Sequence, residues 1–382
     1  MLNKKTIHYP AWAEINLANI KSNFFQLKRQ AGKGVKMLAA VKADAYGHGM
    51  LEVSRQLERC GVDYLGVASV NEAMVLRAGK IKAPILVMGN VVDKSQMKQA
   101  INAQISLTVA DLRGALKLNN NVSAGKKAKV HIKVDTGMGR IGIWHQEAYE
   151  QIIKIFKMKN LLIEGVFTHF PSADTDLEFT KQQIIIFEKL INKLKQNNIT
   201  ISLVHGANSS AVFHLKNFKP KLFNMVRPGL MLYGMYPDRA MKAKSCFKLK
   251  PVLELKSRIV FLKTVDQGRA ISYGRTYITQ TKTKIATVSI GYADGYSRAL
   301  SNKAQVLIKG KLLPVVGRIC MDQLMVDIGL ASRVKLGDIV TLIGREKRQA
   351  IFSETLATLC DTIPYEITCG ISARVKRVFK KH

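Results

Sequence analysis

Two hydrophobic patterns alternate along the chain from Lys36 to about Tyr233. Short apolar runs rich in β-branched residues are separated by stretches whose apolar residues recur every three or four positions, as in amphipathic helices. The runs lie at residues 37–41, 64–68, 84–88, 105–109, 129–134, 163–168, 201–204 and 225–226, and the helical stretches include 51–59, 71–78, 149–158 and 177–194. Eight strands that alternate with helices predict an α/β fold, a parallel (β/α)8 barrel, with a doubly wound open sheet as the alternative.

After Gly234 the pattern changes to β-rich runs with few helix-length periods between them. These runs lie at 252–262, 284–290, 304–308, 312–316, 325–328 and 339–343, and one helical stretch follows at 353–360. The chain of 382 residues is also longer than one hydrophobic core usually supports. The sequence therefore predicts two domains: a (β/α)8 barrel over residues 1–240, followed by a separate, mostly β C-terminal domain over residues 241–382.

The chain is strongly basic. It has 60 Lys and Arg against 27 Asp and Glu, a formal net charge of +33 and a sequence pI near 10.0. Such a charge favours anionic partners, and phosphorylated cofactors, acidic surfaces and nucleic acid all meet that description. The basic residues are spread along the chain, with only short clusters at 241–250 and 374–381, and no nucleic-acid-binding motif accompanies them. We therefore interpret them as solvated surface and expect no specific nucleic-acid partner.

The cysteine content and the N-terminal segment favour a cytoplasmic location. The five cysteines are odd in number and contain no C-x-x-C pair, so they indicate neither a disulfide framework nor a zinc site, and we expect no bound metal. The segment MLNKKTIHYPAWAEINL places Glu14 and other polar residues where a signal peptide has an unbroken apolar stretch. No segment has the apolar length needed to cross a membrane, so we expect no membrane association through a spanning helix.

Candidate chemistry lies just after the predicted barrel strands, where barrel enzymes place their active sites. Lys42 follows the first strand, where loss of solvent favours the neutral amine that forms a Schiff base with an aldehyde. A lone lysine at a strand end is more often simply solvated. Polar segments at four other strand ends change that weighting, namely KVDTGMGR (133–140), THF (168–170), HGANSS (205–210) and RPGL (227–230).

The loops after the last two barrel strands are suited to a phosphate group. In barrels these loops often bind phosphate through backbone N–H groups, and here they carry Ser209, Gly229 and Leu230. A Schiff-base lysine together with a phosphate site predicts pyridoxal 5′-phosphate as the cofactor.

Segments spread over essentially the whole chain together resemble the alanine racemase family, whose members are pyridoxal-phosphate enzymes of fold type III. The segments are VKADAYGHG (41–49), DTGMGRIG (135–142), THF (168–170), ANS (207–209), RPG (227–229), SYG (272–274), GYADGY (291–296) and RICMDQ (318–323). The first of them would by itself also suit barrel-only pyridoxal-phosphate-binding proteins, which lack the C-terminal domain. The resemblance implies a homodimer in which the β domain of one subunit covers the barrel mouth of the other, so that the active sites are shared.

The resemblance also implies which residues hold the cofactor. Lys42 would bind it covalently, Arg227 would face its pyridine nitrogen and Arg140 its phenolic oxygen. Its phosphate would be held by Tyr46, Ser209, the backbone of Gly229 and Leu230, and Tyr365, with Asn208 also among the cofactor-binding residues. Because a guanidinium keeps its proton, the pyridine nitrogen would stay unprotonated and the ring would be a weaker electron sink.

Racemisation removes a proton from one face of Cα and delivers one to the other face, so it calls for two acid–base groups. The resemblance implies Lys42 and Tyr273 for this pair, with Tyr273 supplied by the partner subunit. The hydroxyl of a free tyrosine has a pKa of about 10, so a tyrosine that acts as a base near neutral pH has to be polarised. His169, which lies between Arg227 and the tyrosine in the family arrangement, would do this.

Two further implications concern Lys133 and the substrate pocket. Many family members carbamylate the lysine that matches Lys133, which would place an anion beside Arg140 and remove a like-charge repulsion.

Tyr292 and Tyr365 would narrow the entrance of the substrate pocket, and Arg140 and the backbone N–H of Met321 would lie near the substrate carboxylate. A narrow, aromatic-lined pocket excludes long side chains, which favours alanine and leaves serine as a poorer substrate.

The sequence thus predicts an enzyme that interconverts L-alanine and D-alanine and so supplies D-alanine for bacterial peptidoglycan. Alternatives stay open: a racemase of another small amino acid such as serine, a pyridoxal-phosphate-binding carrier, a decarboxylase of a basic or diamino acid, or a nucleic-acid-binding protein. The C-terminal domain with Tyr273 argues against the carrier, and the decarboxylases use other motifs on typically longer chains. Only the net charge favours nucleic acid.

Overall fold

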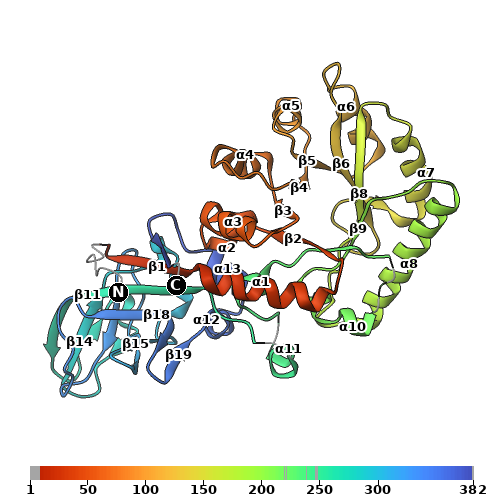
Figure 1. Cartoon of the computed structure of the whole chain (residues 1–382). Helices are drawn as coiled ribbons and strands as arrows, with labels where there is room; N and C mark the ends of the chain where they lie inside the picture. The colour runs from red at the N-terminus through yellow and green to blue at the C-terminus, as the bar shows by residue number, and fades with distance from the viewer. Residues whose placement is uncertain (1–8, 219, 221, 238, 246–247, 381–382) are drawn as a thin grey trace. The chain divides into compact units, whose positions relative to one another are not determined.

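The computed structural model describes residues 9–218, 220, 222–237, 239–245 and 248–380, which form two compact units (Figure 1). The first, called the barrel unit, comprises residues 19–45 and the described residues of 49–250. The second, called the β unit, comprises residues 9–18, 46–48 and 251–380. The β unit therefore contains N-terminal residues that the sequence pattern had placed in the barrel domain.

Eight parallel strands form the wall of the barrel unit. They are β2 (Lys36–Ala40), β3 (Tyr64–Val67), β4 (Ile85–Asn90), β5 (Ser106–Val109), β6 (Ala128–Asp135), β8 (Leu161–Phe167), β9 (Leu203–His205) and β10 (Met225–Val226), and the short β7 (Ile143–Trp144) adds to β6. Each strand pairs with the next in this series, and β10 pairs with β2 through Met225 and Lys36. This last pairing closes the ring, so the predicted (β/α)8 barrel is confirmed and the open sheet is excluded.

Helices α3 to α8 lie outside the barrel strands (Figure 1). The helices of this part of the chain are α1 (Leu17–Ala31), α2 (Lys42–Gly47), α3 (Met50–Arg59), α4 (Val70–Ala78), α5 (Lys94–Asn102), α6 (Leu112–Asn119), α7 (His145–Phe156), α8 (Leu177–Gln196), α9 (Ser209–Phe213), α10 (Leu215–Phe218), η1 (Leu230–Tyr233) and α11 (Arg239–Lys244). In α8 the side chain of Asp176 caps the first turn, and the row Ile184, Phe187, Ile191 and Leu194 is buried, as its spacing predicts. None of the described helices combines the length and apolarity that a bilayer crossing requires.

A mostly antiparallel sheet forms the β unit, in the strand order β16-β15-β18-β11-β1-β20. The strands of this sheet are β1 (Ala11–Asn16), β11 (Leu253–Val265), β14 (Thr283–Val288), β15 (Gln305–Ile308), β16 (Lys311–Pro314), β17 (Leu324–Asp327), β18 (Ile339–Glu346), β19 (Gln349–Ile351) and β20 (Lys376–Lys380). Strands β12 (Ala270–Ile271) and β13 (Tyr277–Ile278) form a separate two-stranded sheet. The short helices are η2 (Tyr273–Arg275), η3 (Tyr292–Asp294), η4 (Arg298–Leu300), α12 (Ser353–Leu359) and α13 (Pro364–Cys369). The separate, mostly β C-terminal domain is confirmed.

Strand β1 differs from the expected domain division. It pairs antiparallel with β11 and parallel with β20, so the first strand of the described residues lies inside the sheet of the β unit, next to its last strand β20. The boundary expected between residues 240 and 241 thus lies near Lys250 in the structure, and the N-terminal end of the predicted 1–240 domain belongs to the other unit. Partners more than 230 residues away along the chain decide this placement, and local hydrophobic patterning does not report such partners.

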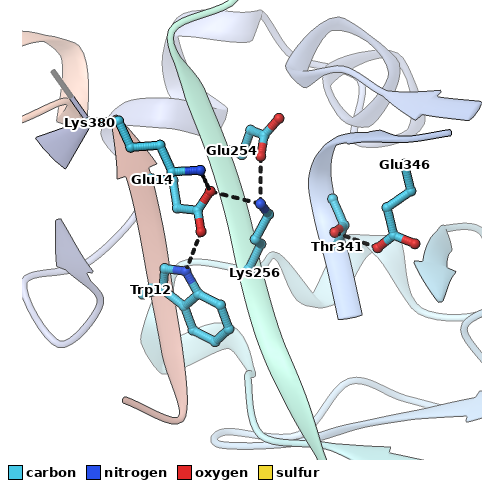
Figure 2. Close-up of polar contacts among 7 residues, drawn as sticks. All are labelled: Trp12, Glu14, Glu254, Lys256, Thr341, Glu346 and Lys380. Carbon is cyan, nitrogen blue, oxygen red and sulfur yellow. Dashed lines mark hydrogen bonds and ion pairs between the residues drawn. The ribbon is translucent and has the colours of Figure 1, made fainter. Parts of the chain in front are cut away.

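A buried carboxylate joins β1 to both of its neighbours (Figure 2). Glu14 accepts a hydrogen bond from Trp12 Nε1 at 3.0 Å and pairs with Lys256 of β11 at 2.7 Å and with Lys380 of β20. Lys256 also pairs with Glu254 at 2.6 Å. Burial opposes ionisation of Glu14, but these partners outweigh it and lower the pKa of the carboxyl to about 2. Strand β1 is therefore held by charge as well as by its backbone hydrogen bonds to β11 and β20.

Candidate active site

The first barrel strand leads into a left-handed turn at Lys42. Helix α2 has φ values from 51° to 55° at four consecutive non-glycine residues, 43–46. L-residues lose roughly 1–2 kcal/mol each in this conformation, so the turn persists only because its surroundings hold it. Glu72 accepts the Ala43 N–H at 2.7 Å, and the Asp44 carboxylate accepts the Met50 N–H at 2.7 Å. Strain of this kind concentrates at functional sites, and here it directly follows the candidate lysine.

Four further basic groups share the environment of Lys42 in the barrel unit: Lys133 near the end of β6, Arg140 in the next loop, His169 after β8, and Arg227 after β10. Lys133 is 3% exposed and Arg227 is 5% exposed. Burial, then the charges of Arg140 and Arg227, lower the pKa of Lys133 to about 8. Burial and the four neighbouring cations, Arg227 first, hold the pKa of His169 well below its usual range. The imidazole is therefore neutral near neutral pH, in a strongly positive site.

Arg227 is held by several hydrogen bonds. Its Nη1 lies 2.7 Å from His205 Nδ1, and its Nη2 donates to the carbonyl oxygen of Thr168 at 2.6 Å and of Gly206 at 3.2 Å. The same Nη2 lies 3.3 Å from His169 Nδ1. Burial lowers the pKa of Arg227 to about 9, which still leaves the guanidinium protonated at neutral pH. Arg227 is thus a fixed, permanently charged donor.

The loop that presents Arg140 is folded around Asp135, a residue that the motif analysis did not select. The Asp135 carboxylate accepts four successive backbone N–H groups, of residues 137–140, at 2.8–3.2 Å. Burial opposes ionisation, but these bonds outweigh it and lower the pKa of Asp135. The run D-T-G-M-G-R carried a signal, since an aspartate followed by glycines is typical of a side-chain-to-backbone turn.

Ser209 connects the two loops that were predicted to bind phosphate. It begins α9, and its Oγ accepts the N–H of Gly229 at 2.9 Å, one residue before Leu230 begins η1. Asn208 caps α9 with its side-chain oxygen and donates its amide to Phe170 O at 2.9 Å. The structure therefore brings the four predicted loop residues together. Within the described residues, no three His, Cys, Asp or Glu side chains are arranged to hold a metal ion.

Tyr46 and Tyr365 meet within the β unit. Their ring centroids are 5.9 Å apart with an interplanar angle of 42°, and Tyr365 lies on α13. Burial, then Tyr365 and Cys369, raise the pKa of Tyr46, so its hydroxyl stays protonated. Gly47 packs so closely that a Cβ built on it would lie 2.0 Å from the carbonyl oxygen of Thr368. The last residues of α2 and helix α13 are thus closely packed against each other within the β unit.

Three predicted site residues of the β unit are exposed: Tyr273 at 70%, Tyr292 at 42% and Met321 at 52%. Their backbones are held firmly. Ser272, which precedes Tyr273, has a φ of 65° and donates its hydroxyl to Arg318 O at 2.6 Å. Tyr292 N donates to Cys320 O at 3.1 Å, beside Met321. Large side chains presented on a rigid backbone are typical of a recognition surface.

A closed barrel whose first strand leads into a lysine among several cations, together with a mostly β unit that presents tyrosines, defines a two-domain barrel enzyme with a site for an anionic ligand. The sequence matches the alanine racemase N-terminal domain over residues 15–237 and the alanine racemase C-terminal domain over residues 252–379. The chain belongs to the alanine racemase family, isomerases that interconvert the enantiomers of alanine.

Individual relatives support this assignment over the full length. The chain is 45% identical to an alanine racemase of Halothermothrix orenii, over 98% of both chains. It is similar in structure to alanine racemase of Clostridium difficile 630, with a TM-score of 0.91 at 41% identity, over 98% of this chain and 97% of that one. Alanine racemase from Bacillus anthracis with bound L-Ala-P gives a TM-score of 0.91 at 36% identity, over 98% and 96%.

Proposed function

We propose that this chain racemises L-alanine and D-alanine with pyridoxal 5′-phosphate, by two-base proton transfer at Cα, and so supplies D-alanine for bacterial peptidoglycan. The observation that carries the proposal is the cluster of cations around Lys42, in which Lys133 and Arg227 are buried and Arg140 is exposed. The relative from Bacillus anthracis was solved with bound L-Ala-P, which is consistent with an alanine-sized substrate. The cytoplasmic location stays a prediction.

The charges of the barrel unit fit a phosphorylated aldehyde. The charges of Arg140 and Arg227 lower the pKa of Lys133, and all three cations lower the pKa of His169. The oxygens of Asp135 are taken by backbone N–H groups. A multiply charged anion would neutralise such a site, and the linked loops at Ser209 and Gly229 suit a phosphate. When bound, the cofactor supplies an electron-withdrawing ring that acidifies the Cα proton of an amino acid attached to it.

The residues that would hold the cofactor follow the family pattern. Lys42 would bind it covalently, Arg227 would donate to the pyridine nitrogen and Arg140 to the phenolic oxygen. The phosphate would be bound by Tyr46, Ser209, the backbone of Gly229 and Leu230, and Tyr365, with Asn208 beside them. Because Arg227 stays protonated and hydrogen-bonded on both Nη atoms, it would act as a donor only.

Two groups would move the proton. Lys42 Nζ would exchange it on one face of Cα, and Oη of the partner subunit's Tyr273 on the other, so that a homodimer is the catalytic unit. The high exposure of Tyr273 in a single chain supports this, because the side chain is available to a second copy. His169, neutral because of burial and Arg227, would accept or donate a hydrogen bond that polarises the tyrosine.

Substrate size would be set by the β unit. Tyr292 and Tyr365 would narrow the entrance, and Arg140 with the backbone N–H of Met321 would bind the substrate carboxylate. We also propose that Lys133 is carbamylated, because its lowered pKa makes a neutral amine available to CO2 and the product would offset the charge of Arg140. A pocket entrance narrowed by Tyr292 and Tyr365 would favour a substrate with a methyl side chain.

The experiment that tests the function follows L-alanine in D2O with the purified protein and pyridoxal phosphate, by optical rotation and by the NMR signal of the Cα proton. Decay to a racemic mixture with deuterium at Cα is the expected result. Exchange without inversion, or no reaction, would contradict the proposal and favour a cofactor carrier. Release of an amine would instead identify a decarboxylase.

A further inference from the structure

A line of buried polar side chains crosses the interior of the barrel from Arg227. His205 on β9 lies 2.7 Å from Arg227 through Nδ1, and 2.9 Å from His131 Nδ1 on β6 through Nε2. His131 Nε2 in turn lies 3.7 Å from Oε2 of Glu164 on β8. Both histidines are 0% exposed, and the Glu164 side chain is 18% exposed. His205 and His131 therefore connect Arg227 of the candidate site to the carboxylate of Glu164 through the interior of the barrel.

Hydrogen-bond chemistry gives this line a direction. A guanidinium only donates, so His205 Nδ1 has to accept, and a neutral imidazole then carries its proton on Nε2. That proton is donated to His131 Nδ1, which places the proton of His131 on Nε2. His131 Nε2 has no hydrogen-bond partner among the described residues within ordinary length, and the Glu164 oxygen is about 0.5 Å beyond it.

The protonation states of His131, His205 and Glu164 agree with this donor-to-acceptor order. Burial, chiefly, lowers the pKa of His131 and holds that of His205 well below its usual range, so both imidazoles are neutral near neutral pH. Burial opposes ionisation of Glu164, but His131 and Ser106 outweigh it and lower the pKa of the carboxyl. An anion, two neutral rings and a cation thus lie in sequence. Such an arrangement polarises each bond in the same sense.

Neighbouring groups fix each member of the line. Phe167 stacks on the His205 ring with centroids 4.9 Å apart and planes 1° apart. A Cβ built on Gly165 would lie 2.6 Å from His131 Nδ1, so only glycine leaves room for the ring. Ser106 donates its hydroxyl to Glu164 Oε2 at 2.5 Å. The rings cannot turn without displacing packed neighbours.

We propose that Glu164 and His131 are positioning residues for Arg227, which they hold in orientation and balance in charge through His205. The proposal rests on the proposed function, in which Arg227 faces the cofactor. Glu164 polarises His131, His131 strengthens His205 as an acceptor, and His205 holds one Nη of the guanidinium. Backbone carbonyls hold Nη2 of Arg227, and the line of Glu164, His131 and His205 orients Nη1.

The first test uses the full chain without cofactor. Protein labelled with 15N in its histidines is examined by NMR near neutral pH, and the two rings are assigned with His131→Gln and His205→Gln variants. Both rings are expected as the Nε2–H tautomer. A proton on Nδ1 of either ring, or a doubly protonated ring, would overturn the proposal.

The second test measures coupling along the line in Glu164→Gln, with Glu178→Gln as the matched control, since Glu178 is a 72% exposed partner of Lys181. Glu164→Gln should move the 15N resonances of both His131 and His205, and lower kcat for alanine roughly tenfold with KM within about twofold. The pH dependence of the absorbance of bound pyridoxal phosphate should shift as well. An unmoved His205 resonance, or kcat equal to that of the control, would overturn the proposal.

Two measures keep the outcome clear. If Glu164→Gln does not fold, Ser106→Ala removes only one donor to the carboxylate and should lower kcat about twofold to threefold, with the same spectroscopic shifts in smaller size. If wild-type protein fails to racemise alanine while both tautomers are as expected, the proposed function fails and the line stands. If the protein racemises alanine but either histidine carries its proton on Nδ1, the proposed function stands and the proposed role of Glu164 and His131 fails.

Discussion

Lys133 is a buried lysine whose protonation changes close to neutral pH. Its pKa is lowered to about 8 by burial and by Arg140 and Arg227, so the neutral fraction rises as the pH passes upward through 8. Carbamate formation consumes the neutral amine. With 13C-bicarbonate we expect a carbamate signal in 13C NMR that grows between pH 7 and about 9 and is missing in Lys133→Ala. An identical signal in that variant would place the modification elsewhere.

Tyr273 offers a second prediction at the residue scale. In Tyr273→Phe one of the two proposed proton donors is removed while the ring and its packing stay. Racemisation should fall at least about a hundredfold, whereas deuterium exchange at Cα of one alanine enantiomer in D2O should persist, because Lys42 still serves one face. Chiral analysis with NMR separates the two quantities. Undiminished racemisation would show that the tyrosine is not a base.

At the scale of elements, the contact between Gly47 and α13 is too tight for a side chain. Gly47 has a φ of 82° and lies against Thr368 O, so Gly47→Ala combines backbone strain with a steric clash. Gly61→Ala is the matched control, because Gly61 has a φ of 73° with open space around it. The control should lose about 1–2 kcal/mol in unfolding free energy, and Gly47→Ala clearly more. Equal losses in thermal or denaturant unfolding would contradict the clash.

The charge cluster around Glu14 gives strand β1 a pH-dependent attachment. Because its folded pKa of about 2 lies below the ordinary 4.5, the stabilisation is complete above about pH 4.5 and is lost as the pH falls toward 2. The shift corresponds to about 3 kcal/mol. Glu14→Gln should therefore lower the unfolding temperature clearly at pH 7 and much less at pH 3. A difference that is the same at both pH values would assign the effect to packing.

At the scale of the whole molecule, the proposed sharing of the active site between two subunits predicts complementation between two inactive variants. Lys42→Ala and Tyr273→Phe, denatured together in equal amounts and refolded, would form mixed dimers in which one of the two sites is intact. Since half of the dimers are mixed, about one quarter of the wild-type activity should return. Each variant refolded alone is the control. Activity that does not exceed the controls would show that Lys42 and Tyr273 act within one subunit.

The barrel was predictable from the sequence because its information is local. Eight apolar runs with helical periods between them placed Lys42 and the polar segments 133–140 and 227–230 at strand ends. The resemblance to the alanine racemase family then implied the roles of Lys133, Arg140 and Arg227. The structure brings these residues into one electrostatic environment. Fold class was therefore determined by the repeated pattern, and the candidate site by the rule that strand ends meet at one mouth.

Other features depended on partners that are distant in sequence. The placement of β1 between β11 and β20, the left-handed turn after Lys42, and the line from Arg227 through His205 and His131 all lie beyond local patterning. A histidine inside a strand has the same sequence context whether it faces solvent, core or another histidine. By itself the sequence determined which residue types stand at which strand ends; only the tertiary structure decided which buried polar groups meet, because closure of the barrel sets their distances.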